Sequence, residues 1–267
     1  MKYIVFFLLI TRIAIAQVYP PEPVTGLLGA FGAEVTLVKQ SLLESDTVRV
    51  DGVLFTTGRI GQQRVVVAET GIGKVNAAMT TTLLLSHFHP KQVLFTGIAG
   101  GTNPNLQPGD IVIARQTTHH DYQSITFDQK PTKQTRNALT GAMNPAFFPA
   151  DSLMLARAQT VAQSVTFEPI PGTSRPPSAL TGIVVTGDQF ISSGQKGVQL
   201  RQDFGADATE MEGAAVAQVC YQLRVPCLVI RSLSDRADDN ARQDMLSFYQ
   251  TAARNSAKLV LAIVCKL

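Results

Sequence analysis

The sequence has little of several features that mark particular classes of protein. It contains no Trp, three Cys and 16% charged residues among its 267 residues, with a formal net charge of +3. Without a run of Lys and Arg it offers no stripe that could follow a phosphate backbone, so we expect no nucleic-acid partner. It also lacks internal repeats and low-complexity tracts, while 45% of its residues are hydrophobic. These properties are typical of a folded globular protein, and the length fits one domain with a large core.

The three cysteines, Cys220, Cys227 and Cys265, show no metal-ligand spacing, and an odd number cannot all pair within one molecule. The favoured interpretation is that they are small, buried hydrophobic residues. The alternative is a disulfide, between Cys220 and Cys227 or another pair, which an exported location would permit. The sequence leaves this choice open.

The first sixteen residues read MKYIVFFLLITRIAIA, a lysine and an apolar run followed by Ala14 and Ala16 in an A-x-A arrangement. This pattern predicts a signal peptide at residues 1–16 and an exported domain at residues 17–267, either periplasmic or secreted. The alternative is that the apolar run is a buried first strand, but Val24–Phe31 already offers a separate one. The run is too short to span a bilayer, so we expect no stable membrane insertion.

Short apolar runs rich in β-branched residues alternate with helix-like stretches along the chain. The runs are VTGLLGAF, RVVVAET, KQVLFTGIAG, GDIVIAR, ALTGIVVTGD and PCLVIRSLSD. The helical stretches are Val75–His87, Ser152–Ser164, Glu212–Leu223 and a last helix that begins after Asp239 and runs towards Val264. Such alternation predicts an α/β fold with a largely parallel sheet covered by helices. Residues 128–150 and 167–179 are rich in Pro, Gly and polar residues and predict long surface connections; the first is either a lid beside a pocket or a solvated excursion.

Polar residues follow several of the apolar strand runs directly. Four such segments are Gly29–Glu34, Thr96–Gly101, Gly187–Ile191 and Ser234–Asp235. In open α/β sheets, ligands bind in the crevice beyond the carboxyl ends of the strands, so these segments are the candidates for a site. The glycines of TGIAGG let the backbone approach a ligand closely, although a tight turn alone would also explain them.

Carboxylates stand out at two of the strand ends. Glu210 and Glu212 flank Met211 just before a helix rich in small residues. They could complement the positive end of that helix, or accept hydrogen bonds from two adjacent hydroxyls such as those of a ribose. Asp235 ends a long apolar strand, where partial burial would raise its pKa and suit it to donate a proton. Its alternative role is to cap the following helix.

Several motifs occur together in an order and spacing that is highly specific. They are GLLGAFGAEV at Gly26–Val35, TGIGKVNAA at Thr70–Ala78, TGIAGG at Thr96–Gly101, GDIVIA at Gly109–Ala114, HHD at His119–Asp121, TGDQFI at Thr186–Ile191, ATEMEGAAVA and RSLSDRAD. With this set the chain resembles the methylthioadenosine/S-adenosylhomocysteine nucleosidases of the nucleoside phosphorylase superfamily over nearly all of residues 24–264. The resemblance implies a single-domain three-layer sandwich with a mixed, largely parallel central sheet.

The resemblance also implies roles for particular residues. Glu34 matches the family glutamate that orients and activates the attacking water, and Arg231 matches an arginine that helps to hold the water or anion. Asp235 matches the acid that delivers a proton to purine N7. Glu212 matches the glutamate that binds the ribose hydroxyls, and Met211 matches a residue that lines the ribose and thioether pocket.

The same resemblance places apolar residues around the base and the 5′-substituent. Phe190 matches an aromatic residue that stacks on the purine, and the backbone of Ile191 matches the element that reads the purine edge. Ile72 and Phe127 match apolar positions around the 5′-substituent. Ile98 is a departure, because the family usually carries a small hydroxyl residue in this turn facing the water or phosphate. An apolar side chain there argues against a phosphorylase, whose phosphate site would want hydroxyl and other donors.

The residue types fit hydrolysis of an adenosine-type thionucleoside. Adenine leaves when its N7 is protonated, so an acid at Asp235 and a base at Glu34 would serve the two proton transfers. A carboxylate at Glu212 would favour the cationic transition state of the sugar. This chemistry needs no metal or organic cofactor. The resemblance further implies a homodimer, and two alternatives stay open: a phosphate-dependent phosphorylase, and a non-catalytic exported nucleoside-binding or storage protein.

Overall fold

The computed structural model describes residues 22–124 and 133–267. The signal peptide predicted at residues 1–16 lies outside the described residues, as does Phe127. Domain limits and export therefore stay predictions. Among the described helices, none is both long and apolar enough to cross a membrane.

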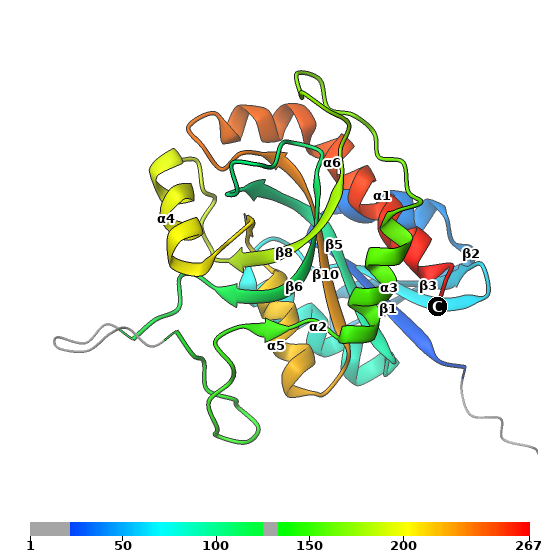
Figure 1. Ribbon diagram of the computed structural model, residues 1–267. Coiled ribbons are helices and arrows are strands. Elements are labelled where there is room, and N and C mark those ends of the chain that lie inside the picture. Colours follow the sequence, from blue (N-terminus) through cyan, green and yellow to red (C-terminus); the bar gives the residue numbers. More distant parts are fainter. Residues whose placement is uncertain (1–21, 125–132) are drawn as a thin grey trace, which may run out of the picture.

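Strands and helices alternate along most of the described chain (Figure 1). The strands are β1 (Val24–Gly29), β2 (Leu43–Val50), β3 (Val53–Ile60), β4 (Gln63–Glu69), β5 (Gln92–Gly101), β6 (Ile111–His119), β7 (Phe148–Pro149), β8 (Ala179–Thr186), β9 (Ala208–Glu210) and β10 (Cys227–Asp235). The helices are α1 (Gly32–Gln40), α2 (Lys74–Phe88), α3 (Ser152–Ala162), α4 (Gly194–Phe204), α5 (Gly213–Gln222) and α6 (Ala241–Val264).

All of the strands belong to one mixed sheet. Its order is β10-β6-β8-β9-β5-β1-β4-β3-β2, with β7 on β6. Because β10 also pairs with β5, strands β5, β10, β6, β8 and β9 close into a ring, and the remaining strands extend from β5. The central pairs β1–β4, β1–β5, β5–β10, β6–β8 and β8–β9 are parallel, whereas β2–β3, β3–β4, β5–β9, β6–β7 and β6–β10 are antiparallel. The α/β fold with a mixed sheet is confirmed, and the antiparallel share is larger than the sequence predicts.

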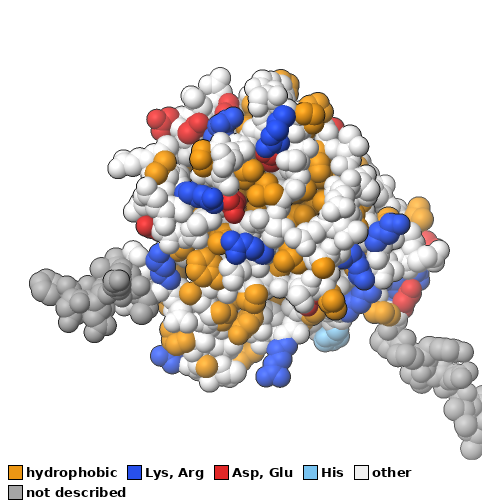
Figure 2. Space-filling model, in the orientation of Figure 1, with side chains coloured by type: hydrophobic (Ala, Val, Ile, Leu, Met, Phe, Trp, Pro, Cys, Tyr) orange, Lys and Arg blue, Asp and Glu red, His pale blue; other side chains and the backbone are white. Residues whose placement is uncertain are grey.

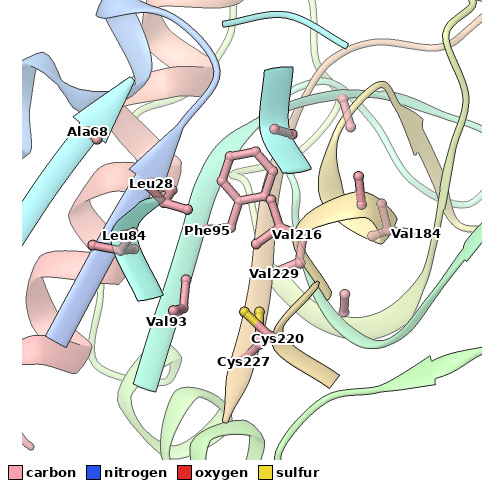
Figure 3. Close-up of a cluster of buried hydrophobic side chains, with 14 of the residues drawn as sticks. Leu28, Ala68, Leu84, Val93, Phe95, Val184, Val216, Cys220, Cys227 and Val229 are labelled. Carbon is pink, nitrogen blue, oxygen red and sulfur yellow. The ribbon is translucent and has the colours of Figure 1, made fainter. Parts of the chain in front are cut away.

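Helices cover both faces of this sheet, which gives three layers (Figure 1). In β5, Val93 and Phe95 pack in a cluster with α2 and α5, whereas Leu94 between them packs with α1, α3 and α6. Side chains of a strand alternate between its two faces, so a strand buried on both faces needs the near-continuous apolar sequence observed here. Figure 3 shows the first cluster, where the sulfur atoms of Cys220 on α5 and Cys227 on β10 lie next to each other as free thiols.

The predicted helices are confirmed with ends that shift by one or two residues, but other elements went unpredicted. Helices α1 and α4 and the β2–β3 hairpin were not anticipated. Strand β2 is exposed along almost its whole length, so it lacks the alternation by which a half-buried strand is found. The segment 167–179 is the predicted surface connection, because it has no helix or strand before Ala179 and most of its residues are exposed. Phe167 and Ile170 are buried within it and anchor the connection to the core.

The carboxyl ends of several parallel strands meet on one side of the molecule. Glu34 follows β1, Ile98 lies near the end of β5, Phe190 follows β8, and Asp235 ends β10. The fold therefore gathers the candidate site residues at one edge of the sheet, as the strand-end argument predicts.

On the face drawn in Figure 2, Lys and Arg side chains are separated from one another by apolar and neutral side chains.

Candidate active site

A cavity of about 360 Å³ lies at these strand ends. Its lining residues are Ala30, Phe31, Glu34, Ile72, Ile98, Ala99, Gly100, Phe190, Thr209, Glu210, Met211, Glu212, Ser234, Asp235, Met245, Leu246 and Tyr249. Four carboxyl groups therefore meet apolar and aromatic side chains in one space. Such a combination is typical of small-molecule sites, in which apolar walls surround a few polar groups that fix orientation.

Glu34 lies in the first turn of α1 with 2% of its surface exposed. Its carboxylate accepts hydrogen bonds from the backbone N–H groups of Ala30 and Ile98, the latter at 2.9 Å. A Cβ atom at Gly97 would come within 2.6 Å of Glu34 Oε1, so only glycine lets β5 pass this carboxylate. Burial raises the pKa of Glu34 to about 6, although Arg231 and the backbone donors act in the opposite direction. The group can therefore hold or release a proton near neutral pH.

Arg231 is buried beneath the cavity and pairs with Glu210. Its Nη2 lies 2.7 Å from Glu210 Oε2, and its guanidinium stacks 4.0 Å from the centre of the Phe95 ring. Burial opposes the charge of Arg231, but the carboxylates of Glu210, Glu34 and Glu212 outweigh it and raise the pKa. Arg231 is not part of the cavity lining, and its Nη1 donates to the backbone carbonyls of Phe95 and Ile230 at 3.4 and 3.3 Å.

Glu210 holds the start of α5 in place. Its carboxylate accepts hydrogen bonds from the N–H groups of Glu212 and Gly213 and from the hydroxyl of Thr186. These contacts satisfy backbone donors that a helix N-terminus otherwise leaves free. Glu210 therefore complements the positive end of α5, which is one of the two roles that the sequence suggests for this pair of carboxylates. Glu212 is available for another partner.

Glu212 and Met211 both line the cavity, although an extended segment would place them on opposite faces. The chain turns after β9 at Glu210, which brings the two side chains to a common space. Glu212 Oε1 accepts a hydrogen bond of 2.7 Å from the N–H of Gly73. Burial and then the nearby charge of Glu210 raise the pKa of Glu212 to about 8. A carboxyl group in this state can accept or donate hydrogen bonds to a diol.

Asp235 is 2% exposed at the end of β10. It accepts hydrogen bonds from the hydroxyl of Ser234 at 2.7 Å and from the N–H of Ala237 at 2.8 Å. Burial raises its pKa to about 6, against the lowering effect of these two donors. Helix α6 begins only at Ala241, so Asp235 does not cap it and the alternative structural role is excluded.

The remaining predicted positions divide into two groups. Ile72, Ile98 and Phe190 line the cavity, and Phe190 is 47% exposed, so its ring is open to a ligand. Ile191 is buried and packs in the cluster between β8 and α4. Its side chain lies outside the cavity lining, which is compatible with a backbone role only.

Sequence reasoning missed a second wall of the cavity. Met245, Leu246 and Tyr249 come from the first turns of α6, and Phe31 lies 6.2 Å from Tyr249 between ring centres. The three helix residues recur at the spacing of one helix face, but that signal alone cannot distinguish a pocket wall from a core face. Thr209 also lines the cavity, and its hydroxyl is buried with no partner among the described residues.

The arrangement can perform acid–base chemistry on a nucleoside-sized ligand. Glu34 and Asp235 titrate near pH 6, and Glu212 offers a carboxyl group suited to a diol. Within residues 22–124 and 133–267, no three His, Cys, Asp or Glu side chains are grouped to hold a metal ion. The site is therefore that of an α/β enzyme whose proton transfers rest on buried carboxyl groups. Residues 25–264 match the model of the Phosphorylase superfamily, and the chain belongs to this family.

Relatives of known activity match almost the entire chain. A 5′-methylthioadenosine/S-adenosylhomocysteine nucleosidase from Psychromonas ingrahamii is 37% identical over 243 residues, which cover 91% of this chain and 98% of the relative. The crystal structure of such a nucleosidase from Colwellia psychrerythraea, in complex with adenine, is 33% identical with a TM-score of 0.80, covering 94% of this chain and 98% of that one. Futalosine hydrolase of Helicobacter pylori is 31% identical with a TM-score of 0.80, covering 92% and 98%. Within the superfamily, the chain therefore belongs with the nucleosidases.

Proposed function

We propose that this protein hydrolyses the N-glycosidic bond of 5′-methylthioadenosine, S-adenosylhomocysteine or a related adenosine nucleoside and releases adenine. The observation that carries the proposal is the convergence of Glu34, Glu212 and Asp235 on one cavity, each buried and each with a raised pKa. Three carboxyl groups in one partly apolar space are costly to ionise, and such clusters are found where proton transfer is needed.

In the proposed reaction, Asp235 donates its proton to N7 of the purine while the bond between N9 and C1′ breaks. Its pKa of about 6 leaves part of the population protonated near neutral pH. The electron pair of the broken bond stays on the purine, and positive charge develops on the ribose. Water attacks C1′, and Glu34 accepts the proton that the water loses. Each of the two proton transfers is expected to contribute about 10²–10⁴-fold to the rate.

The sugar is proposed to be held by Glu212, with Met211 and Ile72 beside the 5′-substituent. Glu212 lies opposite the N–H of Gly73, which fixes one of its oxygens and leaves the other for ribose hydroxyls. With a pKa of about 8, Glu212 is partly protonated near neutral pH, but positive charge developing on the ribose favours its ionised form. That negative charge would stabilise the cationic transition state more than the neutral substrate. The exposed ring of Phe190 supports stacking on the purine.

Hydrolysis is favoured over phosphorolysis by the surroundings of Ile98. This apolar side chain lines the cavity beside Glu34, and its N–H is already bound to the Glu34 carboxylate. Arg231 is engaged by Glu210. Beside Ile98, phosphate would therefore meet a carboxylate and an apolar side chain, and the Arg231 guanidinium is already paired.

The test is incubation of the protein with 5′-methylthioadenosine in phosphate-free buffer, with adenine measured by chromatography. Release of adenine that is unaffected by added phosphate is expected. Adenine release only with phosphate would show a phosphorylase, and binding without cleavage would show a nucleoside-binding protein.

We further propose that the mature protein is an exported homodimer. Export is supported by the sequence of residues 1–16. Dimerisation is supported by exposed apolar side chains beside the cavity, because Ile72, Val75 and Met79 are 57%, 78% and 51% exposed. Intact-mass measurement of native protein that begins at Gln17, and light scattering that gives twice the protomer mass, are the expected results.

A further inference from the structure

The loop that carries Phe190 is fastened at its two ends. It covers residues 187–193, between β8 and α4. Near the start of α4, the Ser192 hydroxyl donates to the carbonyl of Asp238 at 3.3 Å, and the N–H of Gly194 donates to Asp239 Oδ1 at 3.1 Å. These bonds connect the loop to the segment that follows Asp235 in the chain. At its other end, the loop is held by Asp188.

Asp188 belongs to a closed network with Lys74 and Asp121. The N–H of Asp188 donates to Asp121 Oδ2 at 2.9 Å, and the N–H of Lys74 donates to Asp188 Oδ1 at 2.8 Å. Lys74 Nζ lies 2.6 Å from Asp121 Oδ1 and 3.8 Å from Asp188 Oδ2. The three residues come from the start of α2, from the segment just after β6 and from the loop, so the network joins three separate parts of the chain.

The same helix end also holds the proposed ribose carboxylate. Gly73 and Lys74 are consecutive at the start of α2, and the N–H of Gly73 donates to Glu212 Oε1 at 2.7 Å. Gly73 has a φ of 95°, and a Cβ atom there would lie 3.1 Å from Asp188 Oδ1, so this turn requires glycine. Two adjacent amides at a helix N-terminus therefore bind two carboxylates, one on the sugar side and one on the purine loop.

We propose that Lys74, Asp121 and Asp188 form a positioning network that fixes the Phe190 loop relative to Glu212. The purine and the ribose are thereby held in fixed positions relative to each other. This inference rests on the function proposed above. Lys74 and Asp121 have side chains that are only 21% and 15% exposed, so water competes weakly for their ion pair. None of the three residues is part of the cavity lining, so they are positioning residues that act through Phe190 and Glu212.

The experiment measures adenine affinity by calorimetry, and KM and kcat for 5′-methylthioadenosine, in a set of variants. Asp188→Ala removes the acceptor of the Lys74 N–H and is expected to raise the Kd of adenine and the KM by about tenfold. Asp188→Asn keeps an oxygen for that N–H and should restore most of the affinity. Lys74→Met is the second disrupting variant. Lys258→Met on α6, which removes an ion pair with Glu168 away from the network, is the matched control without effect.

The decisive arm repeats Asp188→Ala in a Phe190→Ala background. If the network acts by positioning Phe190, its loss should change adenine affinity by less than about twofold once the ring is gone. A full tenfold effect in that background, or Asp188→Ala and Lys74→Met proteins that bind adenine like the Lys258→Met control, would overturn this inference alone. A wild-type protein that neither binds adenine nor cleaves the nucleoside would overturn the proposed function and this inference with it.

Discussion

Replacement of Asp235 by Asn should make the protein more stable and far less active. Asn is close in size and can keep both local hydrogen bonds of Asp235. Its oxygen can accept from the N–H of Ala237, and its amide can donate to the Ser234 hydroxyl, whose proton can turn to the carbonyl of Ala99 at 3.4 Å. The substitution therefore removes the titratable proton with little change in packing.

The stability gain follows from the raised pKa of Asp235. A carboxyl group whose pKa rises from 3.8 to about 6 on folding binds its proton more tightly in the folded state. Below pH 3.8, the buried group hardly lowers the free energy of unfolding. The loss increases as the pH rises from 3.8 to about 6, and it stays constant above about pH 6. The cost is about 3 kcal/mol at about pH 7.5 and about 1 kcal/mol at about pH 4.5.

Urea unfolding of both proteins at these two pH values measures the difference. Asp235→Asn should exceed wild type by up to about 3 kcal/mol at the higher pH and by about 1 kcal/mol at the lower one. Asp203→Asn, at an exposed position on α4, is the matched control and should change neither value. The kcat of Asp235→Asn should fall by at least about 10²-fold. An equally active Asp235→Asn protein would refute its role as acid, and a pH-independent stability difference would refute the burial argument.

Three further predictions concern the other charged residues of the site. Glu34→Gln should lower kcat by about 10²-fold or more while adenine still binds. Wild-type kcat/KM should fall as the pH falls through about 6, and this decrease should be absent from the pH profile of the variant. If the variant keeps the decrease, another group causes it. Glu212→Gln should raise KM and lower kcat together, because ribose contacts weaken in both ground and transition states, and steady-state kinetics with unchanged KM would contradict this role. Arg231→Met should destabilise the fold by about 3–5 kcal/mol because Glu210 would keep a buried charge without its partner, and a wild-type melting profile would count against the buried pair.

The sequence identifies the site best where the chemistry is local. Asp235 could be placed at a strand end because an apolar run leads directly into it, whereas the segment Thr96–Gly101, which a tight turn would also have explained, continues β5. The strand-end rule for α/β sheets then brings these segments together without any knowledge of the sheet order. The motif set adds Glu34, which lies within a helix that the apolar pattern did not predict.

Other features depend on contacts that no local pattern encodes. The resemblance implies that Arg231 helps to hold the water or anion, but no local pattern indicates its observed partner Glu210, which is 21 residues away in the chain and comes from another strand. Met245 and Tyr249 reach the cavity because α6 packs against β5 and β10, which lie far from it in the chain. Helix α4 is polar and contains glycine at Gly194 and Gly197, a residue of low helix propensity, so its composition does not favour a helix before it packs on β8.

The most direct test of the proposed hydrolysis is to run the reaction in water enriched in the heavy isotope of oxygen and to measure the mass of the released sugar by mass spectrometry. Wild-type protein with 5′-methylthioadenosine, in the absence of phosphate, should give adenine and a free sugar that carries one heavy oxygen from solvent. A sugar phosphate formed only when phosphate is added, or intact nucleoside after prolonged incubation with folded protein, would contradict hydrolysis by a water that Glu34 activates.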